Sequence, residues 1–580
     1  MRVRLAKTAG FCMGVRRAME LALSEANKSD GPLYTYGPLI HNEQVLDLLE
    51  SKGVRSVTDL ETLRDSARGR IITRAHGIPP ATRKALRASP LEVIDGTCPR
   101  VARVQAIIRY YTSKGHTALI VGDPEHAEVV GLVGYAKTSA YVIRHEDEVA
   151  GLPELDRVIL VAQTTQDEKK YGQVTRKVKE RFPDARVFQT ICEATRQRQE
   201  EVRLLAESVD AVVVVGGYHS GNTQRLAQIA RSQGVPTFHV ETEKELDKAT
   251  LARMELIGVT AGASTPNWMI KNVVKEIEGI RDFRDLPWLR WARKGFKFAV
   301  LSNFLAALGA FCLAQAGAVL SGRTAGGLYP FLTFLYIYAM NVLNRFLDKG
   351  ASAYNDPERA AFYRNYKVLL IFSGLLAVTL TLVVAHGLGR TTFWVLCGLS
   401  LLGLLYSLPL VPRAFRGSRR RSRIKDIPGS KPLVEALAWV VFICVVPLLE
   451  GGGPSWPGVT AAGVVVFAMS YARSTLFDLF QFQGDLIVGA ETLPITLGLK
   501  KTSVLLRVVL CVAAAVLLLS PVLGLTPPFS FLVLLSLAAL SFCLAAYERR
   551  WIHPGPALEA LVEGAFILNG LLALLWGWGR

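Results

Sequence analysis

Three cysteines share one local pattern and could bind a metal. Cys12, Cys98 and Cys192 each follow an apolar run that ends in small residues, and each precedes an arginine-rich segment with helical periodicity. A thiol placed where a strand gives way to a helix lies near free backbone N–H groups and the positive end of the helix dipole, and both favour the metal-binding thiolate. Three thiolates spaced 86 and 94 residues apart could converge on one centre, where three protein ligands would leave one position of a four-metal cluster open for chemistry. The alternative for each one is a buried structural cysteine.

A second group of polar side chains follows the ends of apolar, β-branched runs. His41 and His76 stand in GPLIHN and RIITRAHG, and His126 and Glu128 follow ALIVG in DPEHAE. Four further side chains have the same placement: Thr164, Ser220, Asn222 and Ser264. Taken singly, each is more often a surface or core residue, but together with helix N-termini they suit a small diphosphate held by many hydrogen bonds. Glu128 is then the carboxyl group able to deliver a proton, because burial beside phosphate raises its pKa.

The segments that must position these residues alternate between short strands and amphipathic helices over residues 1–280. Runs such as TALIVGD, RVILVAQTT and DAVVVVGG predict α/β units with parallel sheets, whose sites lie at the carboxyl ends of the strands. The spacing of the cysteines is close to one small α/β unit each, which predicts three units. The opening MRVRLAKTAGF lacks the apolar stretch of a secretion signal, so we expect this half in the reducing cytoplasm, where cysteines more often bind metal or react than form disulfides.

Residues 1–280 resemble the 4-hydroxy-3-methylbut-2-enyl diphosphate reductases, the LytB/IspH family, in several short motifs. These motifs are GFCMGV, GPLIHN, RAHG, DGTCP, QTT, HSGNT and TAGAS. The resemblance implies a trefoil-like arrangement of three α/β units around an oxygen-sensitive [4Fe–4S] cluster on Cys12, Cys98 and Cys192. It also implies reduction of the allylic diphosphate to isopentenyl and dimethylallyl diphosphates, the last step of the methylerythritol phosphate pathway, with electrons from a ferredoxin- or flavodoxin-type donor. The alternative is a zinc-binding or structural module.

The same resemblance assigns roles to individual residues. Glu128 would donate the proton, and the diphosphate would be held by His41, His76, His126, Thr164, Ser220, Gly221, Asn222 and Ser264. Gly221 stands where the family commonly has a serine, so only its backbone N–H can serve. Ala127 replaces a usual proline between His126 and Glu128, which loosens the turn and keeps both functional side chains.

The second half of the chain has the composition of a membrane domain. The whole sequence of 580 residues is 50% hydrophobic, and from about residue 297 onward it consists of long apolar runs. Nine runs of about 20 residues, long enough to cross a bilayer as helices, predict an all-α multi-pass domain over 297–580. Their centres lie near residues 308, 336, 376, 400, 440, 466, 512, 536 and 568. Residues 281–296, RDFRDLPWLRWARKGF, mix arginine with tryptophan and predict an interfacial linker, with an ordinary solvated helix as the alternative.

The net charge of +18 gives the expected orientation in the membrane. Much of the excess lies in short loops between apolar runs, above all in PRAFRGSRRRSRIKDIPGSK between the fourth and fifth runs, whereas LEGGGPSWP carries no lysine or arginine. The positive-inside rule therefore places the even-numbered loops and the N-terminal half on the cytoplasmic side of the cytoplasmic membrane. The sequence contains no nucleic-acid motif or basic groove interleaved with aromatic residues, so we expect no nucleic-acid partner.

Polar residues at the ends of two predicted membrane helices indicate a second site. Asn344 and Asp348 lie one turn apart on the second helix, and Asp478 and Asp485 lie two turns apart on the sixth. Charged groups inside a membrane are costly, and two facing carboxylate clusters could hold Mg²⁺ against a prenyl diphosphate.

Residues 295–580 resemble the UbiA family of intramembrane prenyltransferases through NRFLD and GDLIVGAETLPITLG. The resemblance implies a polyprenyl diphosphate donor and a lipid-soluble acceptor. Ser352 and Gln481 stand where that family usually has carboxylates. A catalytically degenerate membrane anchor is therefore the alternative.

Overall fold

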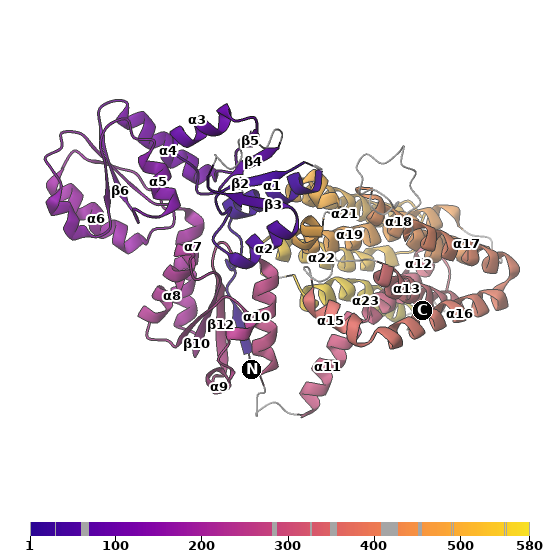
Figure 1. The fold of residues 1–580 in the computed structure, drawn as a ribbon. Helices are drawn as coiled ribbons and strands as arrows, with labels where there is room; N and C mark the ends of the chain where they lie inside the picture. Colours follow the sequence, from indigo (N-terminus) through magenta and orange to yellow (C-terminus); the bar gives the residue numbers. More distant parts are fainter. Residues whose placement is uncertain are drawn as a thin grey trace. The chain divides into compact units, whose positions relative to one another are not determined.

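The chain separates into two compact units, Met1–Phe283 and Arg284–Arg580, in the computed structural model (Figure 1). The structure describes residues 2–28, 31–59, 69–280, 287–324, 327–347, 356–407, 427–449, 455–488, 490, 492–549, 551–552 and 554–578. The first unit is α/β and the second is helical, as the sequence predicts.

The first unit is built from three four-stranded parallel sheets. One sheet has the order β3 (Val54–Val57), β2 (Leu33–Tyr36), β4 (Arg70–Thr73), β5 (Glu92–Ile94). The next has the order β7 (Ala140–Ile143), β6 (Thr117–Val121), β8 (Val158–Ala162), β9 (Arg186–Val187). The third has the order β1 (Arg2–Leu5), β12 (Leu256–Ala261), β10 (Ala211–Val215), β11 (Thr237–Val240). The predicted three α/β units are therefore confirmed.

The N-terminal strand closes the last sheet rather than the first. Strand β1 pairs in parallel with β12, with Arg2 opposite Leu256 and Leu5 opposite Val259. Cys12, which follows β1, thus belongs to the sheet formed by the end of the unit, whereas Cys98 and Cys192 follow the edge strands β5 and β9 of the other two sheets. Each sheet contributes one cysteine.

Helices connect the parallel strands of the first unit. These helices are α1 (Met13–Lys28), α2 (Glu43–Ser51), α3 (Pro80–Ala88), α4 (Pro99–Thr112), α5 (Ala127–Val133), α6 (Glu168–Arg181), α7 (Glu193–Ala206), α8 (Gly221–Ser232), α9 (Lys248–Leu251) and α10 (Asn267–Gly279). Two short 3₁₀ turns, Glu146–Gly151 and Glu243–Glu245, complete the unit. Every residue of β8 and β10 is buried, which is expected of central parallel strands covered on both faces.

The second unit consists of helices and is embedded in the membrane. Its helices are α11 (Pro287–Leu301), α12 (Phe304–Leu320), α13 (Leu328–Leu347), α15 (Pro357–Asn365), α16 (Lys367–Leu388), α17 (Arg390–Ser407), α18 (Ser430–Val440), α19 (Trp456–Val488), α20 (Leu493–Leu497), α21 (Leu499–Val522), α22 (Phe529–Glu548) and α23 (Pro556–Trp578). Helix α18 continues through a π turn, Val441–Val445, and a 3₁₀ turn, Val446–Leu448. Each of the nine predicted apolar runs is centred within one of these helices.

The number of membrane spans depends on how one bent pair of helices is counted. Within the described residues, six helices have the length and apolarity of a span, or seven if Trp291–Leu301 and Phe304–Leu320, which are bent by 70°, form one span. Asn303 sits at this bend with φ 62°, and its side-chain amide donates to the hydroxyl of Tyr363 at 2.7 Å. Helices α13 and α17 are further apolar helices of 20 and 18 residues.

Small residues let the membrane helices approach closely. A Cβ added to Gly309 of α12 would lie 2.9 Å from Cβ of Phe566, and one added to Gly570 of α23 would lie 2.5 Å from Sγ of Cys312. Such contacts replace the hydrophobic effect as the source of helix association in lipid.

The predicted linker falls at the start of this unit. Residues 281–286 lie outside the described residues, and the remainder forms the first part of α11. The side chains of Trp288 and Trp291 are 65% and 76% exposed. An interfacial position of this helix stays a prediction.

Candidate active site

The three cysteines occupy equivalent positions at the N-termini of three helices. Cys98 and Cys192 are the N-cap residues of α4 and α7, and Cys12 directly precedes α1. Their backbone N–H groups are also used in the same way. That of Cys98 donates to the carbonyl of Ala75, that of Cys192 to Thr164, and that of Cys12 to Ala263, at 2.9, 2.9 and 3.2 Å. Each cysteine is thus fastened to a loop that carries a predicted polar site residue: His76, Thr164 or Ser264.

One pocket brings together every site residue predicted for this unit. Its lining includes Cys12, His41, His76, Cys98, His126, Glu128, Thr164, Cys192, Ser220, Gly221, Asn222 and Ser264. These residues span more than 250 positions of the sequence, and all of them lie at the carboxyl ends of parallel strands or at the helix N-termini that follow. The placement is the one that parallel α/β architecture predicts.

The space around the thiols fits a bound cluster. A Cβ added to Gly14 would lie 2.5 Å from Sγ of Cys98 and 4.0 Å from Sγ of Cys12, so only glycine leaves room there. The backbone N–H of Val15 points at Sγ of Cys12 at 3.4 Å, which supplies a donor to a thiolate.

The thiol spacing also bears on which metal would fit. Among the described residues, one group of three metal-ligating side chains has ligand atoms that all lie within 4.8 Å of one another, and this group is the three histidines. The sulfur atoms of the three cysteines are spaced more widely than that. Two thiolates on a single zinc ion lie about 3.8 Å apart, given a zinc–sulfur distance of about 2.3 Å. The wider spacing suits a centre of several atoms better than one ion.

Burial opposes the thiolate that the helix N-terminus was expected to favour. The pKa of the Cys98 thiol is raised, first by burial and then by the neighbouring thiols of Cys12 and Cys192, against the hydrogen bonds from the backbone of α4. The start of α4 favours the thiolate, as expected, but burial outweighs it at this position. A bound metal would supply the missing positive charge, because a coordinating thiol is deprotonated.

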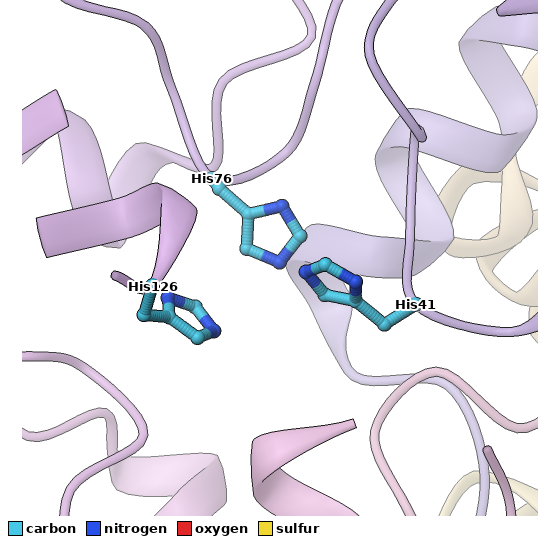
Figure 2. Close-up of side chains that lie close together, drawn as sticks. All are labelled: His41, His76 and His126. Atoms are coloured by element: carbon cyan, nitrogen blue, oxygen red, sulfur yellow. The ribbon is translucent and has the colours of Figure 1, made fainter. Parts of the chain in front are cut away.

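Three histidines from three loops form the other end of the pocket. Figure 2 shows the rings of His41, His76 and His126 pointing toward one another, and their centroids are 4.7, 5.8 and 5.5 Å apart. Burial lowers the pKa of all three, that of His126 to about 4, and the positive charges of neighbouring histidines and Arg74 lower them further. Without a bound anion, the three imidazoles are therefore neutral near pH 7.

These imidazoles have hydrogen-bonding capacity to spare. Nε2 of His41 and Nδ1 of His76 are buried and have no hydrogen-bond partner within the described part of the chain. Nδ1 of His126 accepts from the backbone N–H of Glu128 at 3.1 Å and so caps α5, which assigns the ring proton of the neutral form to Nε2. An anion with several oxygens would satisfy these groups.

Glu128 is a buried carboxyl group held by one residue. It is 2% exposed, and it accepts from the backbone N–H of Thr164 at 2.7 Å and from the hydroxyl of Thr164 at 2.9 Å. Burial raises its pKa to about 7 although both hydrogen bonds act to lower it. Glu128 can therefore hold and release a proton near neutral pH, as a general acid must.

Hydroxyl and amide groups at the start of α8 complete the anion-binding surface. The hydroxyl of Ser264 donates to the carbonyl of His41 at 3.2 Å and lies 3.3 Å from that of Ser220, the N-cap of α8. Nδ2 of Asn222 is buried and has no partner among the described residues. Gly221, the first residue of α8, lines the pocket, and a Cβ added to it would meet nothing within 4 Å. A helix N-terminus of this kind favours phosphate.

Sequence reasoning missed the residues that hold the cysteine loops. Asp95 accepts at Oδ1 from the backbone N–H of Thr97 and the hydroxyl of Thr73, both at 3.0 Å, and at Oδ2 from Arg83 at 2.7 Å. Burial would raise the pKa of Asp95, but these hydrogen bonds outweigh it and hold the pKa well below the usual range. The signal was present in DGTCP, where the aspartate stands three residues before Cys98.

A buried arginine supports the loop of Cys12. The guanidinium of Arg198, 3% exposed, donates to the carbonyl of Gly10 at 2.6 Å. Nothing in its sequence position on α7 distinguishes it from the neighbouring arginines.

Three of the four metal ligands predicted for the second unit lie within the described residues. Asp478 and Asp485 are 1% and 4% exposed on α19, and Asn344 is half-buried on α13. Asp348, Ser352 and the arginine-rich loop residues 412–426 lie outside the described residues. Asp478 is bonded to Lys431 of α18 at 2.8 Å. Within the described residues, no carboxylates of this unit form a group of three with ligand atoms inside 4.8 Å.

Comparison with known proteins agrees with this architecture. The family described as LytB protein matches residues 3–278, and the UbiA prenyltransferase family matches residues 303–570. A protein called 4-hydroxy-3-methylbut-2-enyl diphosphate reductase from Alkaliphilus oremlandii is 41% identical over 282 residues, which is 48% of this chain and 100% of that protein. One of the same name from Oleidesulfovibrio alaskensis is 45% identical over 283 residues, again 48% and 100%.

A solved structure called (E)-4-hydroxy-3-methyl-but-2-enyl diphosphate reductase is 38% identical, with a TM-score of 0.39, and covers 48% of this chain and 100% of that chain. The fold and the site define a membrane protein of two parts. The first part is of the LytB type, with three parallel sheets that each contribute one cysteine to a common pocket, and the second part is helical. The chain belongs to the LytB family, and its second unit is a UbiA prenyltransferase family domain.

Proposed function

We propose that the first unit reduces 4-hydroxy-3-methylbut-2-enyl diphosphate to isopentenyl and dimethylallyl diphosphates. The observation that carries this proposal is the position of Glu128, a carboxyl group with a pKa of about 7, in the same pocket as three cysteines and three neutral histidines. The names of relatives at 41% and 45% identity support it. A reductive dehydroxylation needs an electron source, a proton source and an anion site, and the pocket contains residues for all three.

The reaction balances with two electrons and two protons. The substrate loses its allylic hydroxyl as water, which takes one proton, and the second proton goes to carbon. Proteins of the LytB family use a [4Fe–4S] cluster, which Cys12, Cys98 and Cys192 would hold and which would supply the electrons when bound. Glu128 would hold the proton for the substrate, with Thr164 fixing both of its oxygens.

The diphosphate would be held by the histidines, Ser220, Ser264, Asn222 and the N-terminus of α8. Because the imidazoles are neutral without an anion, an arriving diphosphate would raise their pKa values and draw protons onto them. The anion would then lie beside cations that form only when it binds. The same negative charge would keep Glu128 protonated until the hydroxyl leaves.

Turnover of the full-length protein, purified without oxygen, tests this proposal. With a chemical reductant and the allylic diphosphate, we expect isopentenyl and dimethylallyl diphosphates, and about four irons per chain. A protein that contains zinc and no iron, with undiminished turnover, would rule the cluster out. An iron-containing protein without turnover would assign the first unit to a structural or sensing function.

We propose that the second unit transfers a prenyl group from a polyprenyl diphosphate to a lipid-soluble acceptor. The match to the UbiA prenyltransferase family and the buried carboxylate Asp485 support this proposal, and Asn344 and Asp348 are the other Mg²⁺ ligands that we expect to act with it. Labelled prenyl transfer in membranes that contain the full-length protein is the test, with Asp348→Asn as the inactive control. If no quinone-precursor or geranylgeranyl-type acceptor is labelled, a membrane anchor is the better description.

We propose further that the chain is a multi-pass protein of the cytoplasmic membrane with its first unit in the cytoplasm. The arginine-rich loop between the fourth and fifth apolar runs supports this orientation. A ferredoxin- or flavodoxin-type donor would then reach the first unit in the compartment where such reductants occur.

A further inference from the structure

Helices α18 and α19 face each other with two complementary ion pairs. On α18, Lys431 and Glu435 lie one turn apart, and on α19 they meet Asp478 and Arg473. Nζ of Lys431 donates to Oδ1 of Asp478 at 2.8 Å, and Nη1 of Arg473 donates to Oε1 of Glu435 at 2.8 Å. The cation of the first pair is on α18 and that of the second pair is on α19, so each helix carries one cation and one anion at the contact.

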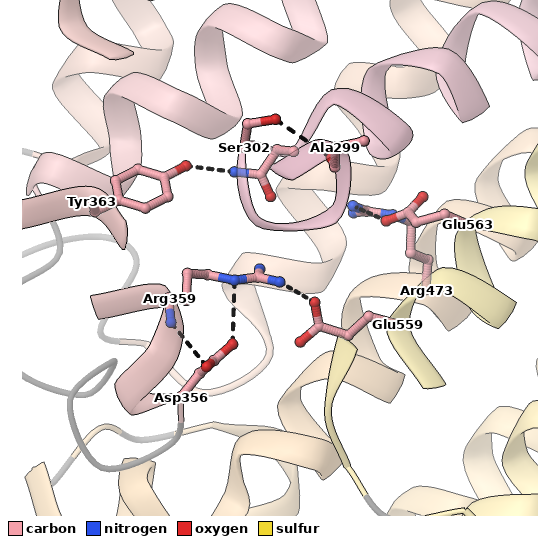
Figure 3. Close-up of polar contacts among 9 residues, drawn as sticks. Ala299, Ser302, Asp356, Arg359, Tyr363, Arg473, Glu559 and Glu563 are labelled. Atoms are coloured by element: carbon pink, nitrogen blue, oxygen red, sulfur yellow. Dashed lines mark hydrogen bonds and ion pairs between the residues drawn. The ribbon is translucent and has the colours of Figure 1, made fainter. Parts of the chain in front are cut away.

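The second pair extends to a third helix. Nε and Nη2 of Arg473 also donate to Oε1 of Glu563 on α23, at 2.9 and 2.6 Å, and Figure 3 shows these two side chains meeting between the helices. The hydroxyl of Ser474 donates to Glu435 at 2.7 Å. Every carboxylate named here is thus bonded to a side chain of the protein itself.

This arrangement does not fit Mg²⁺ at Asp478. Magnesium requires near-octahedral oxygen ligands and loses its water reluctantly, so it is usually held by one or two carboxylates that are free to turn toward it. Asp478 is 1% exposed, and its Oδ1 is used by Lys431. One turn further along α19, Gln481 offers an amide in place of a charge. A metal at Asp478 would have to share this one carboxylate with the ammonium group of Lys431, whose positive charge opposes a second cation there.

We propose that the ammonium group of Lys431 takes the place of a divalent cation at Asp478. Lys431 has three N–H donors, of which Asp478 uses one, and its side chain is 46% exposed. The remaining donors can contact the oxygens of a phosphate-bearing isoprenoid lipid that approaches the end of α18. The identity of that lipid rests on the proposed transfer function, but the replacement of the metal by Lys431 does not.

Binding of Mn²⁺, followed by electron paramagnetic resonance, tests the inference without any turnover. Full-length protein in lipid nanodiscs is titrated with Mn²⁺ as wild type, Lys431→Met, Lys431→Arg, Asp478→Asn and the double variant. Because the histidine cluster of the first unit is the same in all five, the readout is the part of the binding that depends on Asp478.

We expect Asp478→Asn to leave Mn²⁺ binding unchanged in the wild-type background, because Asp478 is not a metal ligand there. Lys431→Met should create an Asp478-dependent Mn²⁺ site that the wild type lacks, since the buried carboxylate is left without a cation. The double variant should lose this site, and Lys431→Arg, which keeps the charge, should match the wild type.

Two results would overturn the inference. One is a wild-type Mn²⁺ site that Asp478→Asn removes, and the other is a folded Lys431→Met protein that gains no site. If Lys431→Met does not fold, the comparison of wild type with Asp478→Asn decides alone. Absence of prenyl transfer in every variant would count against the proposed transferase and would leave these binding results standing.

Discussion

Replacing Glu128 by glutamine separates proton delivery from every other property of the pocket. Glutamine has the same shape, so its carbonyl oxygen can still accept from the backbone N–H of Thr164, and its amide can donate to the Thr164 hydroxyl. The cysteines and the diphosphate ligands are untouched. What the variant lacks is the proton that a carboxyl group with a pKa of about 7 can supply.

The structure gives the size of the effect. The pKa of Glu128 rises from 4.5 to about 7, and at about 1.36 kcal/mol per pH unit this amounts to about 3 kcal/mol in favour of the protonated form. General acid catalysis of this kind contributes about 10²- to 10⁴-fold, so kcat of Glu128→Gln should fall by that factor while iron content and KM stay near the wild-type values.

The pH dependence provides an independent check on Glu128. A group whose pKa is raised by folding is protonated below that pKa, so the acid is present below about pH 7 and is lost as the pH rises through 7. The kcat/KM of the wild type should therefore fall above about pH 7, and that of Glu128→Gln should be low and flat across the same range. A variant that keeps a near-normal kcat, or one that retains the fall above pH 7, would show that another group delivers the proton.

Three further predictions follow from other parts of the chain. Cys98→Ser should lose most reductase activity and bind fewer irons, as measured by anaerobic iron analysis against an Ala88→Ser control on the exposed end of α3; unchanged iron would contradict the ligand assignment. Pyrophosphate binding at pH 7.5 should be accompanied by proton uptake, because burial holds the histidine pKa values low until the anion arrives. Calorimetry in buffers of different ionisation enthalpy measures this uptake, and an uptake that is unchanged in His76→Asn would contradict the prediction. A reporter fused after Arg421 should read cytoplasmic and one fused within GGGPSWP external, and the reverse pattern would refute the orientation.

Much of the fold of the first unit could be predicted because its signals are local. Strands such as β8 and β10 are continuous apolar runs, and each is followed by a loop of small and polar residues. The partner of β1 could not be predicted in this way. Its pairing with β12 joins residues more than 250 positions apart, and neither strand carries a local feature that names the other. The sequence therefore predicts that Cys12 lies between a strand and a helix, but it does not predict the sheet to which that strand belongs.

The site was predictable to the extent that chemistry and strand ends coincide. The three histidines and Glu128 all follow strands, so parallel topology alone brings them together. The protonation state of Cys98 was not predictable, because the helix N-terminus favours the thiolate while burial, which depends on tertiary packing, opposes it. The contact between Lys431 and Asp478 was not predictable for a similar reason. In the sequence, Lys431 is one of several basic residues of a loop, and only the packing of α18 on α19 brings it to a buried carboxylate.

The two proposed diphosphate sites differ in how they would supply positive charge. In the first unit, the imidazoles are neutral without an anion and would become cations only when the proposed diphosphate binds, so positive charge would not be buried without a partner. In the second unit, the charge is permanent, and its desolvation is offset by ion pairs such as Lys431 with Asp478 and Arg473 with Glu563. A permanent cation inside a membrane needs a permanent anion beside it, whatever ligand it later meets. The carboxylate of Asp478 therefore has a structural reason to be there in the absence of metal, and its presence in the sequence does not by itself indicate a metal site.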